Sequence, residues 1–170
     1  MKPFRAAHSL IPFVFSLFML LIPGPATAVD LTVEENTTDP SRYATIQSAI
    51  DYASFYLASN PTTTLKFTVR VLPGTYTGGI VLKNNIPVLG REIMRTFVNG
   101  GPSGVAMTAN NVTGVTVQNL TFLNAQTGIA VSNASTITIT NNVFVGLSGT
   151  AIQISGASSN FITNNTFYNN

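Results

Sequence analysis

The sequence of 170 residues contains no cysteine, no tryptophan and a single histidine, His8. Without cysteine, the chain has no disulfide framework and no thiolate ligands for zinc. His8 lies in an N-terminal segment that we expect to be removed by processing, which would leave the remaining chain without an imidazole. These absences exclude nucleophile–imidazole pairs, reactive thiolates and the usual zinc centres as sources of catalysis.

Charged side chains are few, and the C-terminal part of the chain has none. The eight basic and six acidic residues all lie outside the range from Thr96 to Asn170. Lys2 and Arg5 precede the expected processing site, so six basic residues remain and balance the six acidic ones. The composition therefore indicates no nucleic-acid partner. Because proton transfer at neutral pH needs a titratable side chain, residues 96–170 offer no catalytic candidates, and the catalytic residues stay unknown.

The N-terminus has the order of features that is typical of a signal peptide. A basic start precedes the apolar run Leu10–Ile22, and an Ala-x-Ala pattern at Ala26–Ala28 forms a cleavage site before Val29. The apolar run is shorter than the roughly 20 residues that a membrane-spanning helix needs. The sequence therefore predicts a signal peptide over residues 1–28 and a mature chain without a transmembrane span. We expect this mature chain to be secreted, periplasmic or on the cell surface.

The rest of the sequence repeats itself. Three segments align without internal gaps at intervals of 22 and 23 residues: GVTVQNLTF (114–122), TITITNNVF (136–144) and SNFITNNTF (159–167). Apolar and polar residues alternate within the segments, as in a strand with one buried face, and Gly, Asn and Ser separate them. A period in the twenties built from short β-branched runs predicts a solenoid of stacked parallel strands.

These repeats resemble those of right-handed parallel β-helices in the pectate-lyase-like superfamily. The resemblance implies an all-β, right-handed parallel β-helix of roughly four coils over residues 67–170. It also implies a buried side-chain ladder of one asparagine per coil and an internal stack of phenylalanines. These structural residues would be Asn119, Asn141, Asn164, Phe122, Phe144 and Phe167. We further expect Ile80 and Leu82 to stack under Val105 and Met107, and these in turn under the pairs Ile129/Val131 and Ile152/Ile154.

Residues 29–66 are expected to form an N-terminal segment that contains one capping α-helix. The helix is predicted over Tyr43–Leu57, with Thr45 as its N-cap and an apolar face of small and aliphatic residues. The sequence YATIQSAIDYA in this segment also resembles the cap helix of many pectate-lyase-like proteins. Gln47 and Asp51 are either ligand-binding residues or part of the solvated face of the helix, and we favour the solvated face.

The segment Arg91–Arg95 is the densest charge cluster in the chain. It is either a corner between coils, which we favour, or a grip for an acidic sugar, because guanidinium groups match carboxylates. On the second interpretation the substrate-binding residues are Arg91, Arg95 and Lys83. No metal site and no cofactor are expected. Calcium would enter only if the protein were an enzyme with catalytic coils beyond Asn170.

Three classes of function remain open: a carbohydrate-active enzyme, a polysaccharide-binding module and a structural surface protein. The repeats carry none of the carboxylates that lyases and hydrolases of this fold use, so no family catalytic residue is carried over. We therefore expect an exported protein that binds or scaffolds polysaccharide or a cell-surface glycan. The alternative is the N-terminal part of a polysaccharide lyase, hydrolase or esterase. The sequence stops inside a repeat, so we expect further coils to be missing and the last coil to self-associate.

Overall fold

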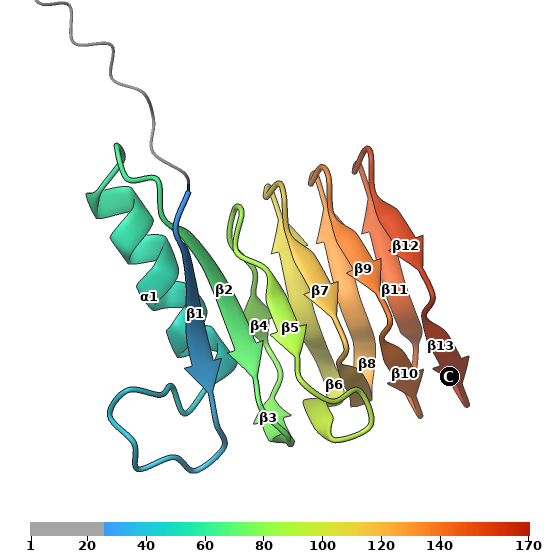
Figure 1. The fold of residues 1–170 in the computed structure, drawn as a ribbon. Helices are drawn as coiled ribbons and strands as arrows, with labels where there is room; N and C mark the ends of the chain where they lie inside the picture. The colour runs from blue at the N-terminus through green and yellow to red at the C-terminus, as the bar shows by residue number, and fades with distance from the viewer. Residues whose placement is uncertain (1–25) are drawn as a thin grey trace, which may run out of the picture.

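The computed structural model describes residues 26–170, and it shows a stack of parallel β coils with a single helix at the N-terminal end (Figure 1). Most of the predicted signal peptide therefore lies outside the described residues. No helix in the described part of the chain is long and apolar enough to cross a membrane.

The coils are built from two parallel sheets. Sheet A contains six strands in the order β1 (Ala28–Val33), β2 (Lys66–Val71), β5 (Val88–Gly90), β7 (Thr116–Gln118), β9 (Thr138–Thr140) and β12 (Phe161–Thr163). Sheet B contains β3 (Gly74–Thr77), β4 (Ile80–Val81), β6 (Thr96–Asn110), β8 (Thr121–Ser132), β10 (Val143–Val145), β11 (Thr150–Ser155) and β13 (Thr166–Tyr168). The chain alternates between the sheets, so each circuit adds one coil. This arrangement confirms the predicted all-β parallel solenoid of about four coils with an N-terminal helix.

The core is formed by residues that point inward at the same register position of successive coils. In sheet A, one such column runs through Leu31, Val69, Val88, Val117, Ile139 and Ile162. The members from Val69 to Ile139 are buried, because each is covered by the coil above and the coil below. The period-two alternation of the sequence thus decides which side chains enter the core.

An aromatic stack lies in the part of sheet B that faces this column. The ring centroids of Phe122 and Phe144 are 4.9 Å apart, and those of Phe144 and Phe167 are 5.3 Å apart. The ring planes are almost parallel, at 10° and 9°. A repeat of one phenylalanine per coil therefore produces a continuous column of rings inside the solenoid.

The asparagine ladder lies one residue later than predicted. Asn119, Asn141 and Asn164 occupy left-handed turn positions, with φ of 58°, 52° and 55°, and none of them is buried. The left-handed residue turns the chain at the corner, so the following residue is the one that points inward. Asparagine tolerates this conformation better than most residues.

The hydrogen-bonded ladder consists of Asn142 and Asn165. The Oδ1 atom of Asn142 accepts from the backbone N–H of Leu120 in the coil below, at 3.0 Å. Its Nδ2 group donates to the carbonyl oxygen of Val117 at 3.0 Å and to Oδ1 of Asn165 at 3.2 Å. Asn165 Oδ1 also accepts from the backbone N–H of Asn142 at 2.9 Å. The ladder therefore joins successive coils through a buried amide, as expected, but at a different position.

The register of the first coils differs from the prediction in a second way. Ile80 pairs with Met107, and Met107 pairs with Ile129, so Ile80 does not lie under Val105. Val105 pairs with Thr127 instead, after a register shift in β6 between Gly101 and Val105. The irregular glycine-containing segment of β6 lengthens this coil, and equal spacing of apolar runs in the sequence does not reveal it.

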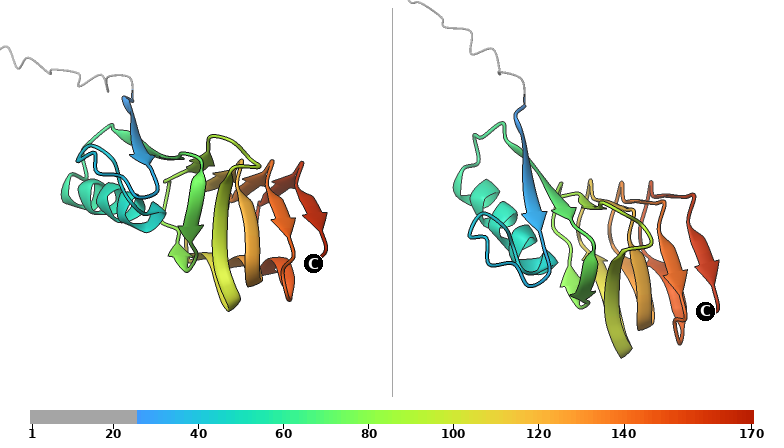
Figure 2. Two further views of the ribbon diagram at one scale, coloured as in Figure 1. Left: turned by 90° about the horizontal axis from the view of Figure 1, so that it is seen from below. Right: turned by 60° about the horizontal axis from the view of Figure 1, so that its bottom comes forward.

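The helix α1 (Ile46–Ser59) covers the N-terminal end of the coils (Figure 2). Its N-cap is Thr45. The Thr45 side chain accepts a hydrogen bond from the backbone N–H of Ser48 at 3.1 Å. The helix buries the side chains of Ile46, Ala49, Ile50 and Ala53. The predicted cap and apolar face are therefore confirmed, although the helix begins three residues later and ends two residues later than the predicted range Tyr43–Leu57.

Gln47 has a structural role that neither interpretation of the sequence included. Its Oε1 atom accepts from the backbone N–H of Val81 at 2.7 Å, and its Nε2 group donates to Asp51 Oδ1 at 2.8 Å. The Nε2 group also lies 3.4 Å from the Val81 carbonyl oxygen. The Gln47 amide thus takes the place that a neighbouring strand would occupy beside β4, and it fixes the helix to this edge.

Candidate functional site

One polar column runs along the outside of sheet A. The parallel register aligns the outward residues Thr32, Arg70, Leu89, Gln118, Thr140 and Thr163. We call this set the outer column. Its members recur about every 4.8 Å along the solenoid axis, which is the spacing of neighbouring strands. The hydroxyl oxygens of Thr140 and Thr163 are 3.0 Å apart, within hydrogen-bond distance.

A cavity of about 360 Å³ lies at the N-terminal end of the outer column. Its lining includes the side chains of three arginines, and we call it the three-arginine cavity. The lining residues are Thr32, Arg42, Arg70, Leu72, Leu89, Gly90 and Arg91. Arg70 reaches it from β2, Arg42 from the segment before α1, and Arg91 from the residue that follows β5. Three segments far apart in the sequence therefore place positive charge around one space.

Two of the three arginines are held by carboxylates. Arg70 Nε lies 2.7 Å from Asp30 Oδ2, across the β1–β2 pair. Arg42 contacts two acidic residues: its Nη1 is 2.7 Å from Glu34 Oε2, and its Nε is 3.1 Å from Asp39 Oδ2. All of these side chains are partly exposed, so each pair contributes little to the stability of the fold. Their effect is to orient the two guanidinium groups.

Hydrogen bonds within the loop stabilise the ionised form of Asp39 beside Arg42. The hydroxyl and the backbone N–H of Ser41 both donate to Asp39 Oδ1, at 2.7 and 2.9 Å. These bonds lower the pKa of the Asp39 carboxyl below its ordinary value, with Arg42 adding to the effect. Asp39 therefore stays ionised to a lower pH than an unperturbed aspartate, and its ion pair with Arg42 persists over the same range.

Arg91 differs from its two neighbours, because no carboxylate in the described part of the chain lies within 4.0 Å of it. Its backbone N–H donates to the carbonyl oxygen of Val71 at 2.8 Å, which fixes the start of the corner. The preceding residue must be glycine, since a Cβ atom on Gly90 would lie 2.1 Å from the carbonyl oxygen of Asn119. The backbone at Arg91 is thus firmly placed while its side chain is exposed.

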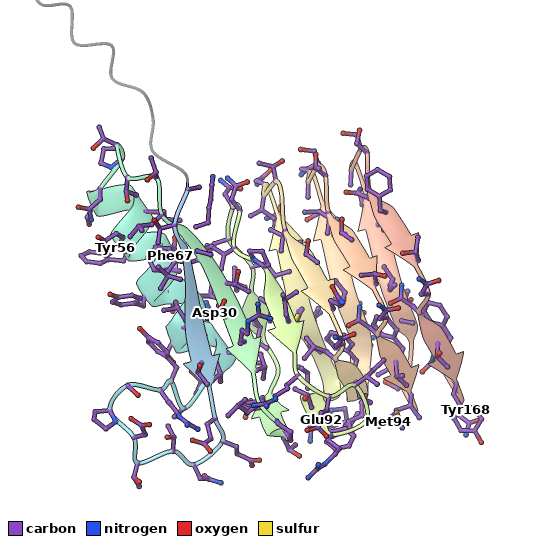
Figure 3. The ribbon with its side chains drawn as sticks, in the orientation of Figure 1. Asp30, Tyr56, Phe67, Glu92, Met94 and Tyr168 are labelled. Atoms are coloured by element: carbon purple, nitrogen blue, oxygen red, sulfur yellow. The ribbon has the colours of Figure 1, made fainter. Side chains whose placement is uncertain are left out.

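The three predicted substrate-binding residues lie in three different places. Arg91 lines the three-arginine cavity, whereas Arg95 pairs with Glu92 at 3.0 Å on the corner between β5 and β6. Figure 3 shows Glu92 on this corner, away from Asp30 on β1. Lys83 lines a separate cavity of about 450 Å³ between α1 and the turns near Asn84 and Asn110. The structure therefore does not bring Arg91, Arg95 and Lys83 together.

The segment Arg91–Arg95 is a corner, as favoured from the sequence. The hydroxyl of Thr121 donates to the carbonyl oxygen of Ile93, which fastens the corner to sheet B. Met94, at the tip of the corner, is exposed. Arg91, the first residue of the corner, also lines the three-arginine cavity.

Arg42 and Arg70 were not predicted from the sequence as members of this site. Arg70 was recognisable in part, because it occupies an outward position of the alternating strand FTVRV. Arg42 carried no such signal, since the path of the polar loop before α1 is set by tertiary contacts. The pairing of β1 with β2 then brings Asp30 beside Arg70 across 40 residues of sequence.

The arrangement favours binding of a negatively charged group rather than acid–base chemistry. The cavity presents guanidinium groups, which donate hydrogen bonds in a planar fork that matches carboxylate and sulfate oxygens. The carboxylates nearest to it are already occupied by Arg42 and Arg70. In the range 26–170, no group of three or more His, Cys, Asp or Glu side chains forms a candidate metal site.

Residues 103–170 match the family described as a right-handed beta helix region. The matched residues run from the C-terminal part of β6 to the last strand, β13. Comparisons with curated proteins and with solved structures found no match.

Proposed function

Because the chain is a right-handed β-helix protein, consistent with the pectate-lyase-like repeat proteins, we propose that it binds polysaccharide outside the cell without cleaving it. The proposed binding surface is the three-arginine cavity together with the outer column. The observation that carries the proposal is Arg91, which has no carboxylate partner among residues 26–170 and lies in a cavity lined by two further arginines. An acidic group on a glycan would supply the missing partner.

The cavity would bind one acidic sugar by charge-assisted hydrogen bonds. Such bonds are stronger than neutral ones, and a guanidinium group can hold both oxygens of a carboxylate. Arg42 and Arg70 would assist mainly through their charge, since their own carboxylate partners orient them. Binding should weaken as salt is added, because these charges are partly exposed to solvent.

The outer column would bind the continuation of the glycan chain. From Leu89 onward the column is uncharged, and Gln118, Thr140 and Thr163 offer amide and hydroxyl groups at the strand spacing. Sugar hydroxyls can both donate to and accept from these groups. The proposed ligand is therefore an extended polysaccharide with at least one acidic group, lying across the strands of sheet A.

Binding can be measured by isothermal titration calorimetry with polygalacturonate, fully methyl-esterified pectin and a neutral β-glucan. We expect polygalacturonate to bind most tightly and its affinity to fall at high salt. Arg91→Ala should weaken this binding about tenfold, equivalent to about 1.4 kcal/mol. Arg95→Ala is the matched control, because Arg95 pairs with Glu92 outside the cavity, and it should bind like the wild type. Equal effects of the two substitutions would contradict the proposed site.

The absence of cleavage is tested separately. The protein should be incubated with the same polysaccharides and calcium, and the formation of reducing ends and unsaturated products followed. We expect no product above the level of a heat-inactivated control. Product formation would favour the alternative function, a polysaccharide-degrading enzyme, and would redirect the search for catalytic residues to further coils.

Export is also part of the proposal. Cleavage before Val29 would remove Thr27 and Ala28, whose backbone contacts Lys66 at the start of the β1–β2 pair. The remaining residues of β1 keep their register with β2. Intact-mass analysis of culture fluid or periplasm should find a chain that begins at Val29. A protein that stays in the cell and retains Met1 would contradict export.

A further inference from the structure

We propose that a second cavity, next to the capping helix, binds a tetrahedral oxyanion, which is a phosphate or sulfate group. This cavity has a volume of about 450 Å³, and we call it the asparagine cavity. Its polar lining comes from α1, from the corner after β4 and from the end of β6, with the residues Ser54, Lys83, Asn84, Asn85, Asn110 and Asn111. The proposal is independent of glycan binding, which uses the three-arginine cavity and the outer column.

Two corners of successive coils form one wall of the asparagine cavity. Asn85 and Asn111 turn the chain at these corners in the left-handed conformation, with φ of 57° and 53°. The backbone N–H of Asn85 donates to the carbonyl oxygen of Thr113 at 2.9 Å. The backbone N–H of Thr113 in turn donates to Oδ1 of Asn84, also at 2.9 Å. These two bonds join the corners, so the wall is in place before any ligand binds.

Lys83 is the only charged residue among those that line the cavity. It is half-buried, and no carboxylate in residues 26–170 lies within 4.0 Å of its ammonium group. A partly buried ammonium group without an acidic partner has lost hydration and gained no ion pair. An anion in the cavity would supply this partner.

The asparagine side chains are oriented so that hydrogen-bond donors remain free. Oδ1 of Asn84 accepts from the backbone N–H of Thr113, which can only donate, so the Nδ2 group of Asn84 is left over. Oδ1 of Asn110 accepts from the hydroxyl of Ser132 at 3.0 Å, which leaves its Nδ2 group as well. Neither Nδ2 group donates to an atom of residues 26–170. The two amides therefore offer donors to a ligand, and an anion offers only acceptors.

A backbone donor adds to this set. The N–H of Val81 donates toward α1, to Oε1 of Gln47 at 2.7 Å, and the N–H of Leu82 donates to the carbonyl oxygen of Thr108 in the next coil at 2.9 Å. Alternate N–H groups of an extended chain point in opposite directions, so the N–H of Lys83 returns to the α1 side. It donates to no atom of residues 26–170. Lys83 thus contributes both a charge and a backbone donor.

The chemistry of these donors differs from that of the three-arginine cavity. A guanidinium group is a planar fork that matches the two oxygens of a carboxylate, whereas an ammonium group acts as a point charge and is a common phosphate ligand. Here a single ammonium group is combined with donors from separate segments, which suits an anion with oxygens in several directions. The volume is within the range of small-molecule sites, so the group can be a free ion or an ester on a small molecule.

Nuclear magnetic resonance titrations of the protein at constant ionic strength test the proposal. We expect inorganic phosphate and inorganic sulfate to shift the backbone amide of Lys83 together with the side-chain amides of Asn84 and Asn110. Glucose 6-phosphate distinguishes the two sources of the group: tighter binding than inorganic phosphate indicates an ester ligand, and weaker binding indicates the free ion. Galacturonate, a planar carboxylate, should bind about tenfold more weakly. The absence of these shifts, or equal affinity for galacturonate, would overturn the proposal.

Two variants separate the asparagine cavity from a general attraction of anions. Lys83→Gln should weaken phosphate binding about tenfold, and Asn110→Asp should weaken it at least as much, because it places a negative charge in the lining without changing its size. Arg95→Gln removes one positive charge outside the cavity and is the matched control, which should bind like the wild type. Equal losses in Lys83→Gln and Arg95→Gln would contradict the site. Arg91→Ala should leave the shift at Lys83 unchanged while weakening polygalacturonate binding, so the two proposals can fail separately.

Discussion

The two ends of the coil stack differ in how they satisfy the edges of the sheets. At the N-terminal end, α1 buries apolar side chains against the first strands, and the side chains of Glu35 and Gln47 accept hydrogen bonds from the edge strands. At the C-terminal end, Phe167 and Ile162 continue the core columns into solvent. The comparison shows that each repeat covers the core of the repeat before it, whereas the N-terminal end is covered by a specialised segment.

The largest expected effect on the free energy of unfolding is at Phe144, and Phe167 in the same aromatic stack is the comparison. Phe144→Ala should lower the free energy of unfolding by about 3–5 kcal/mol, because the ring is buried between two others and its removal leaves a cavity. Phe167→Ala should cost roughly 1 kcal/mol, since about half of its surface is already in water. Urea unfolding at concentrations where the chain is monomeric provides the measurement. Similar losses would mean that the last coil is covered in solution.

The next effect concerns the asparagine ladder. Asn142→Ala should lower the free energy of unfolding by about 1–3 kcal/mol, because backbone groups of Leu120 and Val117 lose a buried partner. Asn141→Gly, at the adjacent left-handed turn, should change it by less than about 0.5 kcal/mol, since glycine adopts this conformation freely. A larger loss for Asn141→Gly would restore the ladder position expected from the sequence.

A smaller effect is expected at the N-terminal end. Gln47→Ala should lower the free energy of unfolding by about 0.5–1.5 kcal/mol through loss of the bond to Val81. Hydrogen exchange should show faster exchange of the Val81 amide, while amides of the C-terminal coils stay unchanged. Asp51→Ala serves as the control and should leave Val81 protected. Unchanged exchange at Val81 in Gln47→Ala would contradict the proposed edge covering.

The smallest effect appears only at alkaline pH. Tyr76 is buried beside Glu35, and burial raises the pKa of its hydroxyl above the ordinary value of 10.0. The unfolded chain therefore loses this proton first, so the contribution to stability is present below pH of about 10 and is lost as pH rises through the folded pKa. The melting temperature of the wild type should fall more steeply than that of Tyr76→Phe between about pH 9 and 11. Parallel curves would exclude a contribution from Tyr76.

Local patterns in the sequence were sufficient to predict the coils, the capping helix and its N-cap at Thr45. Alternation in Thr-Ile-Thr and spacing of 22 and 23 residues depend on strand geometry alone, so they could be interpreted without tertiary information. The position of the ladder could not, because it depends on whether Asn141 or Asn142 adopts the left-handed conformation. The three-arginine cavity could not be predicted from the sequence either, because the path of the loop before α1 is what brings Arg42 to it.

The left-handed asparagine turns determine how the gene can gain or lose whole coils. Each coil contacts only its neighbours and begins and ends at an equivalent corner, with Asn119, Asn141 and Asn164 spaced by 22 and 23 residues. A tandem duplication of about 66 to 69 base pairs, three for each residue, would therefore insert one complete coil without disturbing the others. The gene can lengthen or shorten the protein in steps of about 4.8 Å along its axis, while the cap and the arginine cavity keep their structure.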